Sequence, residues 1–351
     1  MHVFKSILLF LILSSLSLTA YSDSAMGAID HAPIGVMADH YHKKGESMIS
    51  VRQGYMDMSG NLLDGKSISN SQILAMPNPL GDMPANLSVV PTEMDMKMTM
   101  IGAMYAPSDR VTLMAMVMSM SKDMTLNSYQ PMMGRNLIGS FSTSSSDISD
   151  ISLGALIKLQ ETDTSRWHGE VTVQQSIGDN KAKDVVLTPM GMNMEMILPY
   201  GMQAGDDATR LVLGLTNLRT LSEKVVWGNQ LRSRFVVSDN DWSFGDQTEL
   251  NTWLQYALNK SVSFSSRLKV VYQDKLSGRN PMISAPVQTA NPENYGGREV
   301  HFALGVNFLT HILPGKSDRF GLELIKPIQQ EKNNLQMDTD YQFILGYQKA
   351  F

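Results

Sequence analysis

Large apolar side chains occupy every second position along most of this chain, and this alternation limits the available folds more than any other feature. A period of two residues is the side-chain period of a β-strand, whereas a helix would scatter the same residues around its axis. The pattern therefore predicts an all-β protein. The clearest alternating stretches are residues 167–177, 225–235, 261–273 and 298–308.

The connections between the alternating stretches are short and long in turn. The short ones are 107–109, 161–165, 220–223 and 259–260. The long ones are 59–93, 123–147, 178–206 and 274–296. A soluble β-sandwich also alternates apolar and polar residues. Short turns at one end and long loops at the other are instead typical of an outer-membrane barrel.

The end of the chain supports the same fold. Aromatic and apolar residues recur at period two in the last strand, which ends in Phe351. This pattern resembles the C-terminal signal of bacterial outer-membrane proteins and indicates the barrel-assembly machinery as a partner during biogenesis. Lys349 departs from the alternation, although a lysine near a membrane boundary can extend its amine to water.

We predict a transmembrane, antiparallel, up-and-down β-barrel that is closed by the C-terminal strand. An even number of strands places both chain ends on one side, and closure leaves no strand edge open to lipid. The barrel domain is expected over 46–351. The twelve predicted strands are 46–58, 94–106, 110–122, 148–160, 166–177, 208–219, 224–236, 247–258, 261–273, 297–309, 319–328 and 338–351.

The N-terminus predicts export. Residues 1–22 combine a basic Lys5, an apolar run and small residues near position 22, as in a secretory signal peptide. A membrane anchor is the alternative, but the apolar run is short for one. Residues 23–45 are then a short periplasmic segment, and the location is the outer membrane of a Gram-negative bacterium. The absence of cysteine is compatible with export without disulfides, and the net charge of −5 disfavours a nucleic-acid partner.

Four stretches resemble a known family: HAPIGVM (31–37), DHYHKKGE (39–46), GAMYAPSDRVTLM (102–114) and NPENYGGREVHFALGVNF (291–308). They are similar to bacterial outer-membrane proteins that are named as components of the meta-pathway of phenol degradation, or simply as transporters. The likeness covers most of the mature chain. It implies an outer-membrane barrel, a channel, and small solutes that include hydrophobic or aromatic compounds. It brings no settled substrate, so no binding residue follows from it.

The chain has 27 methionines, and the runs of them at even positions are its most unusual feature. Their shared parity places them on one face of two strands joined by a short turn. A three-residue turn at 107–109 would make the numbers of facing partners sum to 216. The resulting ladder pairs Met96 with Met120, Met98 with Met118 and Met100 with Met116 on the lumen wall. A four-residue turn would instead place the two runs on opposite faces of the sheet.

Three roles remain open for this ladder. Methionine fills irregular apolar space, and a wall of thioethers would also give hydrophobic solutes an adaptable path. Thioethers are, in addition, ligands for a soft metal such as Cu(I). The loop TPMGMNMEM (188–196) repeats the pattern, and His40 and His42 supply a second metal-binding pair that a solvated linker explains equally well.

Charged residues alternate with the apolar face and are expected to line the lumen, where they keep a narrow barrel polar and set its selectivity. His168 belongs with them as a network member. An outer-membrane lipid hydrolase is a further alternative, but the chain has no G-x-S-x-G elbow. The expected lumen residues are Arg52, Lys158, Glu170, Arg210, Arg232, Arg234, Glu249, Arg267, Lys269, Glu299, His301 and Glu323.

Overall fold

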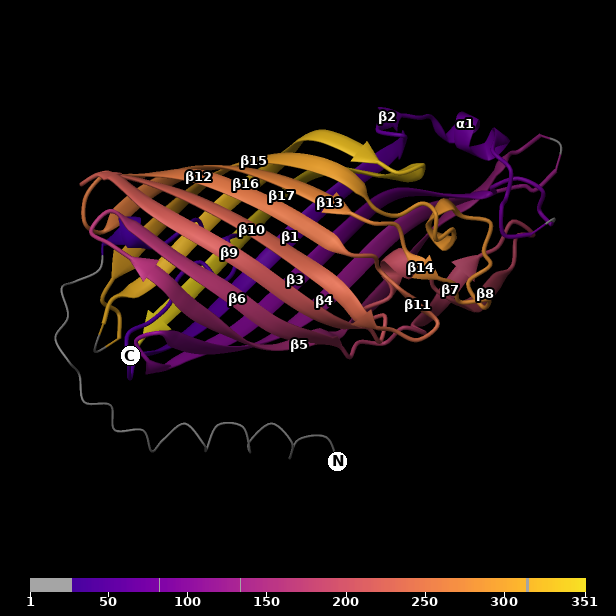
Figure 1. Cartoon of the computed structure of the whole chain (residues 1–351). Coiled ribbons are helices and arrows are strands. Elements are labelled where there is room, and N and C mark those ends of the chain that lie inside the picture. Colours follow the sequence, from indigo (N-terminus) through magenta and orange to yellow (C-terminus); the bar gives the residue numbers. More distant parts are fainter. Residues whose placement is uncertain (1–26, 82, 133, 314–315) are drawn as a thin grey trace.

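Twelve antiparallel strands form one closed barrel in the computed structural model, which describes residues 27–81, 83–132, 134–313 and 316–351 (Figure 1). Each barrel strand pairs with the next one along the chain, and β17 pairs back with β1. The predicted barrel and its closure by the last strand are confirmed. The predicted signal peptide lies outside the described residues.

The barrel strands are β1 (Ser47–Leu63), β3 (Val89–Ser108), β4 (Val111–Tyr129), β5 (Leu137–Glu161), β6 (Ser165–Ser176), β9 (Thr209–Ser222), β10 (Val225–Ser238), β12 (Gln247–Ala257), β13 (Val262–Gln273), β15 (Gly297–Thr310), β16 (Asp318–Lys332) and β17 (Leu335–Ala350). The loops and the N-terminal segment carry η1 (Ala28–Asp30), β2 (Lys66–Ser67), α1 (Asn70–Ala75), β7 (Lys183–Leu187), β8 (Asn193–Ile197), η2 (Tyr200–Met202), β11 (Trp242–Ser243), β14 (Ser277–Gly278) and η3 (Gln288–Ala290). Within the described ranges, no helix has the length and apolar character needed to cross a membrane.

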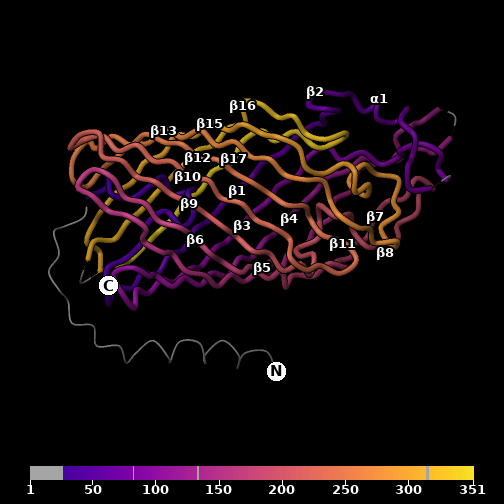
Figure 2. Tube along the Cα trace, in the orientation of Figure 1, coloured from indigo at the N-terminus to yellow at the C-terminus, as the bar shows by residue number. Residues whose placement is uncertain are grey.

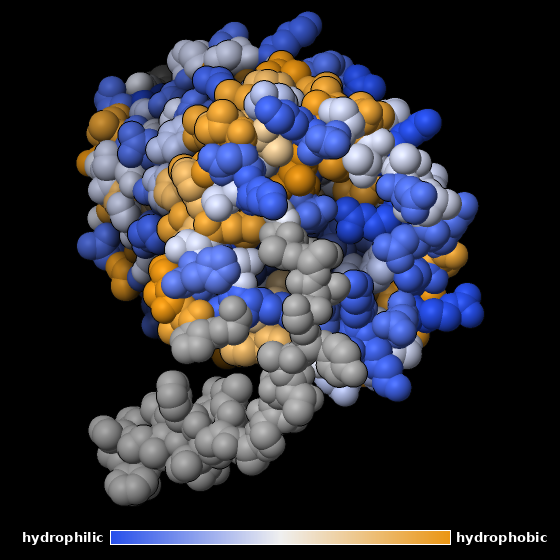
Figure 3. Space-filling view, turned by 90° about the vertical axis from the view of Figure 1, so that its left-hand side faces the viewer, coloured by the Kyte–Doolittle hydropathy of each residue, from blue (hydrophilic) through white to orange (hydrophobic). Residues whose placement is uncertain are grey.

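The two ends of the barrel differ as the connections predict. Tight turns lie at the end where the C-terminus is found, and the loops that carry α1, β7, β8, β11 and β14 lie at the other (Figures 1 and 2). We call these the short-turn end and the long-loop end. Seen from the short-turn end, hydrophilic residues gather on the rim, with apolar residues between them (Figure 3).

Apolar residues on the outer face form a belt around the barrel. Leu113 and Val117 on β4 and Ile101 on β3 are all more than 40% exposed, whereas the even-numbered residues between them are half-buried or buried. This exposure on alternate residues is the pattern that lipid requires of a transmembrane strand. Other belt residues are Leu153, Val171, Leu213, Leu231, Leu250, Phe264, Leu304, Leu322 and Leu345.

Strands β3, β4 and β5 are longer than the predicted 94–106, 110–122 and 148–160. The expected long connection 123–147 is wrong, because most of it is strand and the connection itself is only 130–136. The serine-rich run 142–146 pairs in register with β4. Its polar residues resemble a loop in sequence, yet strands that extend beyond the belt face water and need no apolar side chains.

Candidate functional site

The N-terminal plug, residues 28–42, lies inside the barrel at the short-turn end. Ala32, Ile34 and Val36 are at most 1% exposed. Polar side chains of seven strands bond its backbone, which satisfies the peptide groups that the strands of the barrel cannot reach. The bonds are His168 Nε2 with Ala38 O (2.8 Å), Gln230 Nε2 to Met37 O (2.8 Å), Asn307 Nδ2 to His31 O (3.0 Å), Ser263 Oγ to Ala28 O (2.9 Å), His42 N to Thr112 Oγ1 (2.9 Å), Gly35 N to Glu323 Oε2 (2.9 Å), Gln255 Nε2 to His31 O and Arg319 Nη2 to Ala32 O.

Gly35 sits on a buried ion pair. Glu323 accepts two hydrogen bonds from Arg267, at 2.8 Å from Nε and 2.9 Å from Nη2, and both side chains are almost fully buried. A Cβ on Gly35 would lie 2.2 Å from Glu323 Oε2. Only glycine therefore lets the plug donate its N–H to this carboxylate.

Ile34 fits against two glycines in the barrel wall. Gly321 on β16 faces Gly346 on β17 in the ladder. A Cβ on either glycine would lie 2.7 Å or closer to an Ile34 side-chain atom. The plug and the wall are thus complementary in shape at this point.

Three histidines of the plug lie in a row. The ring centroids of His31 and His40 are 5.7 Å apart, and those of His40 and His42 are 4.9 Å apart. His40 Nδ1 lies 3.0 Å from Asp39 Oδ1, and His42 Nδ1 lies 3.4 Å from Glu46 Oε2. Among the described residues, no group of three or more His, Asp or Glu side chains has the geometry to hold a metal ion.

Burial and neighbouring charges shift the titration of this row. Burial and then the charge of Arg319 lower the pKa of His31 well below its usual value. Burial likewise lowers the pKa of His42, although its bond to Glu46 opposes the shift. That bond is the main cause that lowers the pKa of Glu46 to about 2. Burial alone would raise the pKa of Asp39, but His40 and the nearby arginines together lower it.

The other expected lumen residues form a paired network on the inner face. Arg232 donates to both oxygens of Glu170, at 2.8 and 3.1 Å. His301 Nε2 lies 3.5 Å from Glu299. The remaining contacts join Lys269 with Glu249, Arg210 with Asp206, Lys158 with Glu161, Arg234 with Gln247, and Arg52 with Met37.

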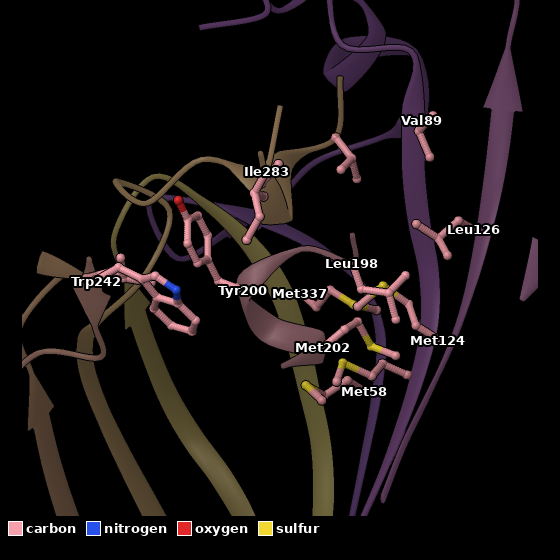
Figure 4. Close-up of a cluster of buried hydrophobic side chains, with 14 residues drawn as sticks. Met58, Val89, Met124, Leu126, Leu198, Tyr200, Met202, Trp242, Ile283 and Met337 are labelled. Carbon is pink, nitrogen blue, oxygen red and sulfur yellow. The ribbon is translucent and has the colours of Figure 1, made fainter. Parts of the chain in front are cut away.

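The long-loop end is filled by apolar residues instead. The methionine cluster consists of five buried methionines whose sulfur atoms gather in one region (Figure 4). It brings together four adjacent barrel strands, β17, β1, β3 and β4, and the loop that carries η2. Its members are Met58, Met94, Met124, Met202 and Met337.

Loops fold into the barrel mouth over this cluster. Lys122 on β4 donates to Gly201 O at 2.9 Å and to Gln203 O at 2.6 Å, which fixes the η2 loop to the wall. Tyr295 Oη accepts from Gly201 N at 2.8 Å and joins the loop between β13 and β15 to it. Tyr200 stacks edge-on against Trp242, with ring centroids 4.8 Å apart. The mouth is thus closed by packed side chains and by hydrogen bonds to backbone.

A cavity of about 430 Å³ lies below this closure. Methionines form one part of its wall, and charged residues of the lumen network, including Asp150, Arg210 and Arg234, form another. Met98, Met100 and Met116 of the predicted ladder are not among its lining residues. The methionines that do line it are Met58, Met94, Met96, Met118, Met120, Met124 and Met337.

The predicted register of the ladder is wrong by two residues. Met98 faces Met120, Met100 faces Met118, and Met96 faces Lys122, so the partner numbers sum to 218. The turn is tighter than expected, because Ser108 already pairs with Val111 and an irregularity follows after Tyr105. Both runs nevertheless lie on the inner face.

Sequence reasoning missed four members of the methionine cluster: Met58, Met124, Met202 and Met337. Met124 falls in the expected connection 123–147. Met58 could have been found, because it continues the even parity of Met56 on a predicted strand. Met337 lies just before the predicted start of the last strand. Met202 belongs to a loop, and no periodic pattern shows where a loop folds back.

No family model and no curated protein matches the chain. Among solved structures, an outer-membrane channel of Pseudomonas putida F1 is similar, with a TM-score of 0.56 and 12% identity over 91% of this chain and 100% of that one. A FadL homologue of Pseudomonas aeruginosa scores 0.42 with 7% identity, covering 95% and 99%. TodX, a monoaromatic hydrocarbon channel, scores 0.45 with 11% identity, covering 93% and 99%. The chain has the fold of an outer-membrane β-barrel channel.

Proposed function

We propose that this protein is an outer-membrane channel for small apolar solutes, aromatic compounds included. The observation that carries the proposal is the methionine-lined cavity inside the barrel. Ligand pockets of about 300–1,000 Å³ with apolar walls and a few polar groups are typical small-molecule sites. Methionine side chains are flexible and polarizable, so they adapt to ligands of different shape.

The filled ends of the barrel favour apolar over hydrophilic solutes. The N-terminal plug crosses the lumen at one end, and packed loops close the mouth at the other. A hydrated solute would have to displace ion pairs and buried backbone bonds. The belt of exposed apolar residues and the fold shared with an outer-membrane channel support the location in the outer membrane.

The test is heavy-atom quenching of Trp242, which packs in the mouth beside the cavity-lining Phe244. In a variant in which Trp242 is the sole tryptophan, 4-bromotoluene should quench its fluorescence in a saturable way. Adding Met118→Phe and Met120→Phe should abolish saturation by filling the cavity. The matched control, Met114→Phe and Met116→Phe, changes methionines of the same strand outside the cavity and should bind normally. Linear quenching in every variant would refute the proposal.

A second candidate function is the binding of Cu(I) or another soft monovalent cation. The convergence of five buried methionines from distant parts of the chain favours it, since thioethers suit soft metals. In this second proposal the metal site is the methionine cluster, and not the ladder with Met98, Met100 and Met116 that the sequence predicts. Met96, Met118 and Met120 adjoin the cluster on the cavity wall, and His40 and His42 belong to the opposite end.

Silver titration tests whether the methionine cluster binds a metal or only packs. Changing Met58, Met94, Met124 and Met337 to leucine roughly conserves volume, and should remove Ag(I) binding while the barrel still folds. The control variant changes Met98, Met100 and Met116 to leucine and should bind as the natural protein does. Thioethers need not lose a proton to bind, so the affinity should be equal at pH 5 and pH 7. Equal binding by both variants would leave packing as the role of the cluster.

A further inference from the structure

The barrel wall is incomplete between its last two strands. The ladder between β16 and β17 runs from Asp318 and Lys349 to Ile325 and Gln342. Both strands continue beyond it, but each pairs with its outer neighbour only: β16 with β15 as far as Lys332, and β17 with β1 as far as Leu335. Within the described structure, residues 326–332 and 335–341 therefore form a gap in the wall.

The sequence accounts for the point at which the ladder stops. Pro327 follows two residues after the last paired position of β16 and has no N–H to donate to a neighbouring strand. The pairing of β16 with β15 also shifts register here, between Val300 and His301. On the other side of the gap, β1 and β17 shift register around Met58. Irregularities on both sides separate the two strands.

Two side chains hold the gap closed in place of the ladder. The carboxamide of Gln330 acts like a peptide group, because its Oε1 accepts from Thr339 N at 3.0 Å and its Nε2 donates to Thr339 O at 3.2 Å. Lys332 Nζ donates to Met337 O and to Thr339 Oγ1, both at 2.8 Å. Gln330 and Lys332 form what we call the latch. Side-chain bonds of this kind can open without breaking a strand pairing.

The gap joins the cavity to the outer edge of the apolar belt. Lys332, Leu335 and Met337, which border the gap, also line the cavity. On the outer face, Ile328 is 61% exposed. Tyr55 stacks on Phe343 at 5.2 Å beside the last paired positions, and aromatic residues of this kind mark the membrane interface.

We propose that the gap between β16 and β17 is a lateral port through which apolar molecules pass between the cavity and the outer leaflet of the membrane. This port rests on the proposed channel function and names its route. An apolar molecule dissolved in lipid reaches the cavity here without crossing either filled end. Opening of the latch frees the N–H and C=O of Thr339 and the C=O of Met337, while each strand keeps its ladder with its outer neighbour.

The test uses thiol labelling, since the natural chain has no cysteine. Met337→Cys places a thiol behind the gap, and Met114→Cys places one behind intact ladders on the inner face. In proteoliposomes, the membrane-dissolved reagent N-pyrenylmaleimide should label position 337 faster than position 114. Adding Gln330→Ala or Lys332→Met should raise the rate at 337 roughly fivefold, the size expected for a lost hydrogen bond. The exposed Gln329→Ala serves as the control and should leave the rate unchanged.

Two further readouts keep the outcomes distinct. The amide hydrogen of Thr339 should exchange faster in Gln330→Ala, while amides of the paired residues 319–324 keep their protection, which shows that the barrel is folded. A charged methanethiosulfonate added from water should show no dependence on the latch. Equal labelling at 337 with and without the latch would overturn the port, and so would faster labelling from water. Neither labelling result depends on bromotoluene binding. The quenching experiment therefore tests the channel proposal separately from the port.

Discussion

The two ends of the barrel are filled by opposite chemistry. At the short-turn end, the plug is held by directional contacts: hydrogen bonds to its backbone, a bidentate ion pair under Gly35, and two glycines that receive Ile34. At the long-loop end, five methionines pack with aromatic and aliphatic residues of the loops. Directional bonds fix one arrangement of the chain, whereas apolar packing between flexible side chains allows several.

This difference indicates that the two ends of the barrel have different roles. The plug resembles a fixed partition, because any displacement leaves buried charges and peptide groups without partners. The methionine cluster can change shape at little cost, and it borders both the cavity and the latched gap. We therefore expect a ligand to move the methionine side and leave the plug in place.

The largest effect should come from the strand that both ends share. β17 supplies Gly346 to the plug contact and Met337 to the methionine cluster. Deleting residues 341–351 removes its whole ladder with β16 and most of its pairing with β1, and leaves strand edges open to lipid. Each unsatisfied backbone group there costs several kcal/mol. The truncated protein should lose heat-modifiable migration on gels and aggregate. Insertion of a stable truncated barrel would contradict the closed fold.

Breaking the ion pair should have the next largest effect and should act on the plug end alone. Glu323→Gln leaves Arg267 buried without its counter-charge, and the loss of one partner of a buried pair typically costs about 3–5 kcal/mol. Urea unfolding in detergent measures the change. The double variant Glu323→Leu and Arg267→Met removes both charges and should recover much of the loss. Bromotoluene quenching of Trp242 should stay saturable in both, unless the two ends are coupled.

Much of this architecture is predictable from the sequence, because lipid and water impose alternation on every residue of a spanning strand. The alternation from Val300 to Phe308, for example, predicts a strand. Parity placed each methionine run on one face of its strand, and the flanking Arg110 and Lys122 indicated that this face looks into the lumen. The register of the two runs did not follow from the sequence, since it depends on one turn residue and on an irregularity near Tyr105 that periodicity does not reveal.

The positions of the plug and loops required the structure. His40 and His42 lie in a segment without periodicity, and a hydrated linker explains the same residues. Their burial depends on acceptors and donors from strands distant in sequence, such as Thr112 and His168. The gap likewise arises from Pro327 and a register shift in neighbouring strands, and neither shows where a ladder ends until the pairing is known.

Acid should weaken the plug end before the methionine end. Burial lowers the pKa values of His31 and His42, so the packed plug binds fewer protons than a released one. Its stabilisation is complete above pH of about 6.5, the ordinary value for histidine. As the pH falls from there toward the lowered pKa values of the two histidines, this stabilisation is lost. Each histidine loses about 1.4 kcal/mol for every unit by which its pKa is lowered. Single-channel conductance should therefore rise below pH 6, and His42→Gln should reduce that rise. Conductance independent of pH would contradict this account.

The smallest effect should come from reshaping the methionine cluster. Met124 is 2% exposed and packs in a cluster of hydrophobic side chains. Met124→Leu conserves volume and should cost less than about 1.5 kcal/mol in urea unfolding, whereas Met124→Ala leaves a cavity and should cost about 2–5 kcal/mol. The leucine variant should also bind bromotoluene with little change, because its wall remains apolar. A loss for Met124→Leu as large as that for Glu323→Gln would mean that this end, too, depends on one fixed arrangement, and the assignment of the adaptable side would be wrong.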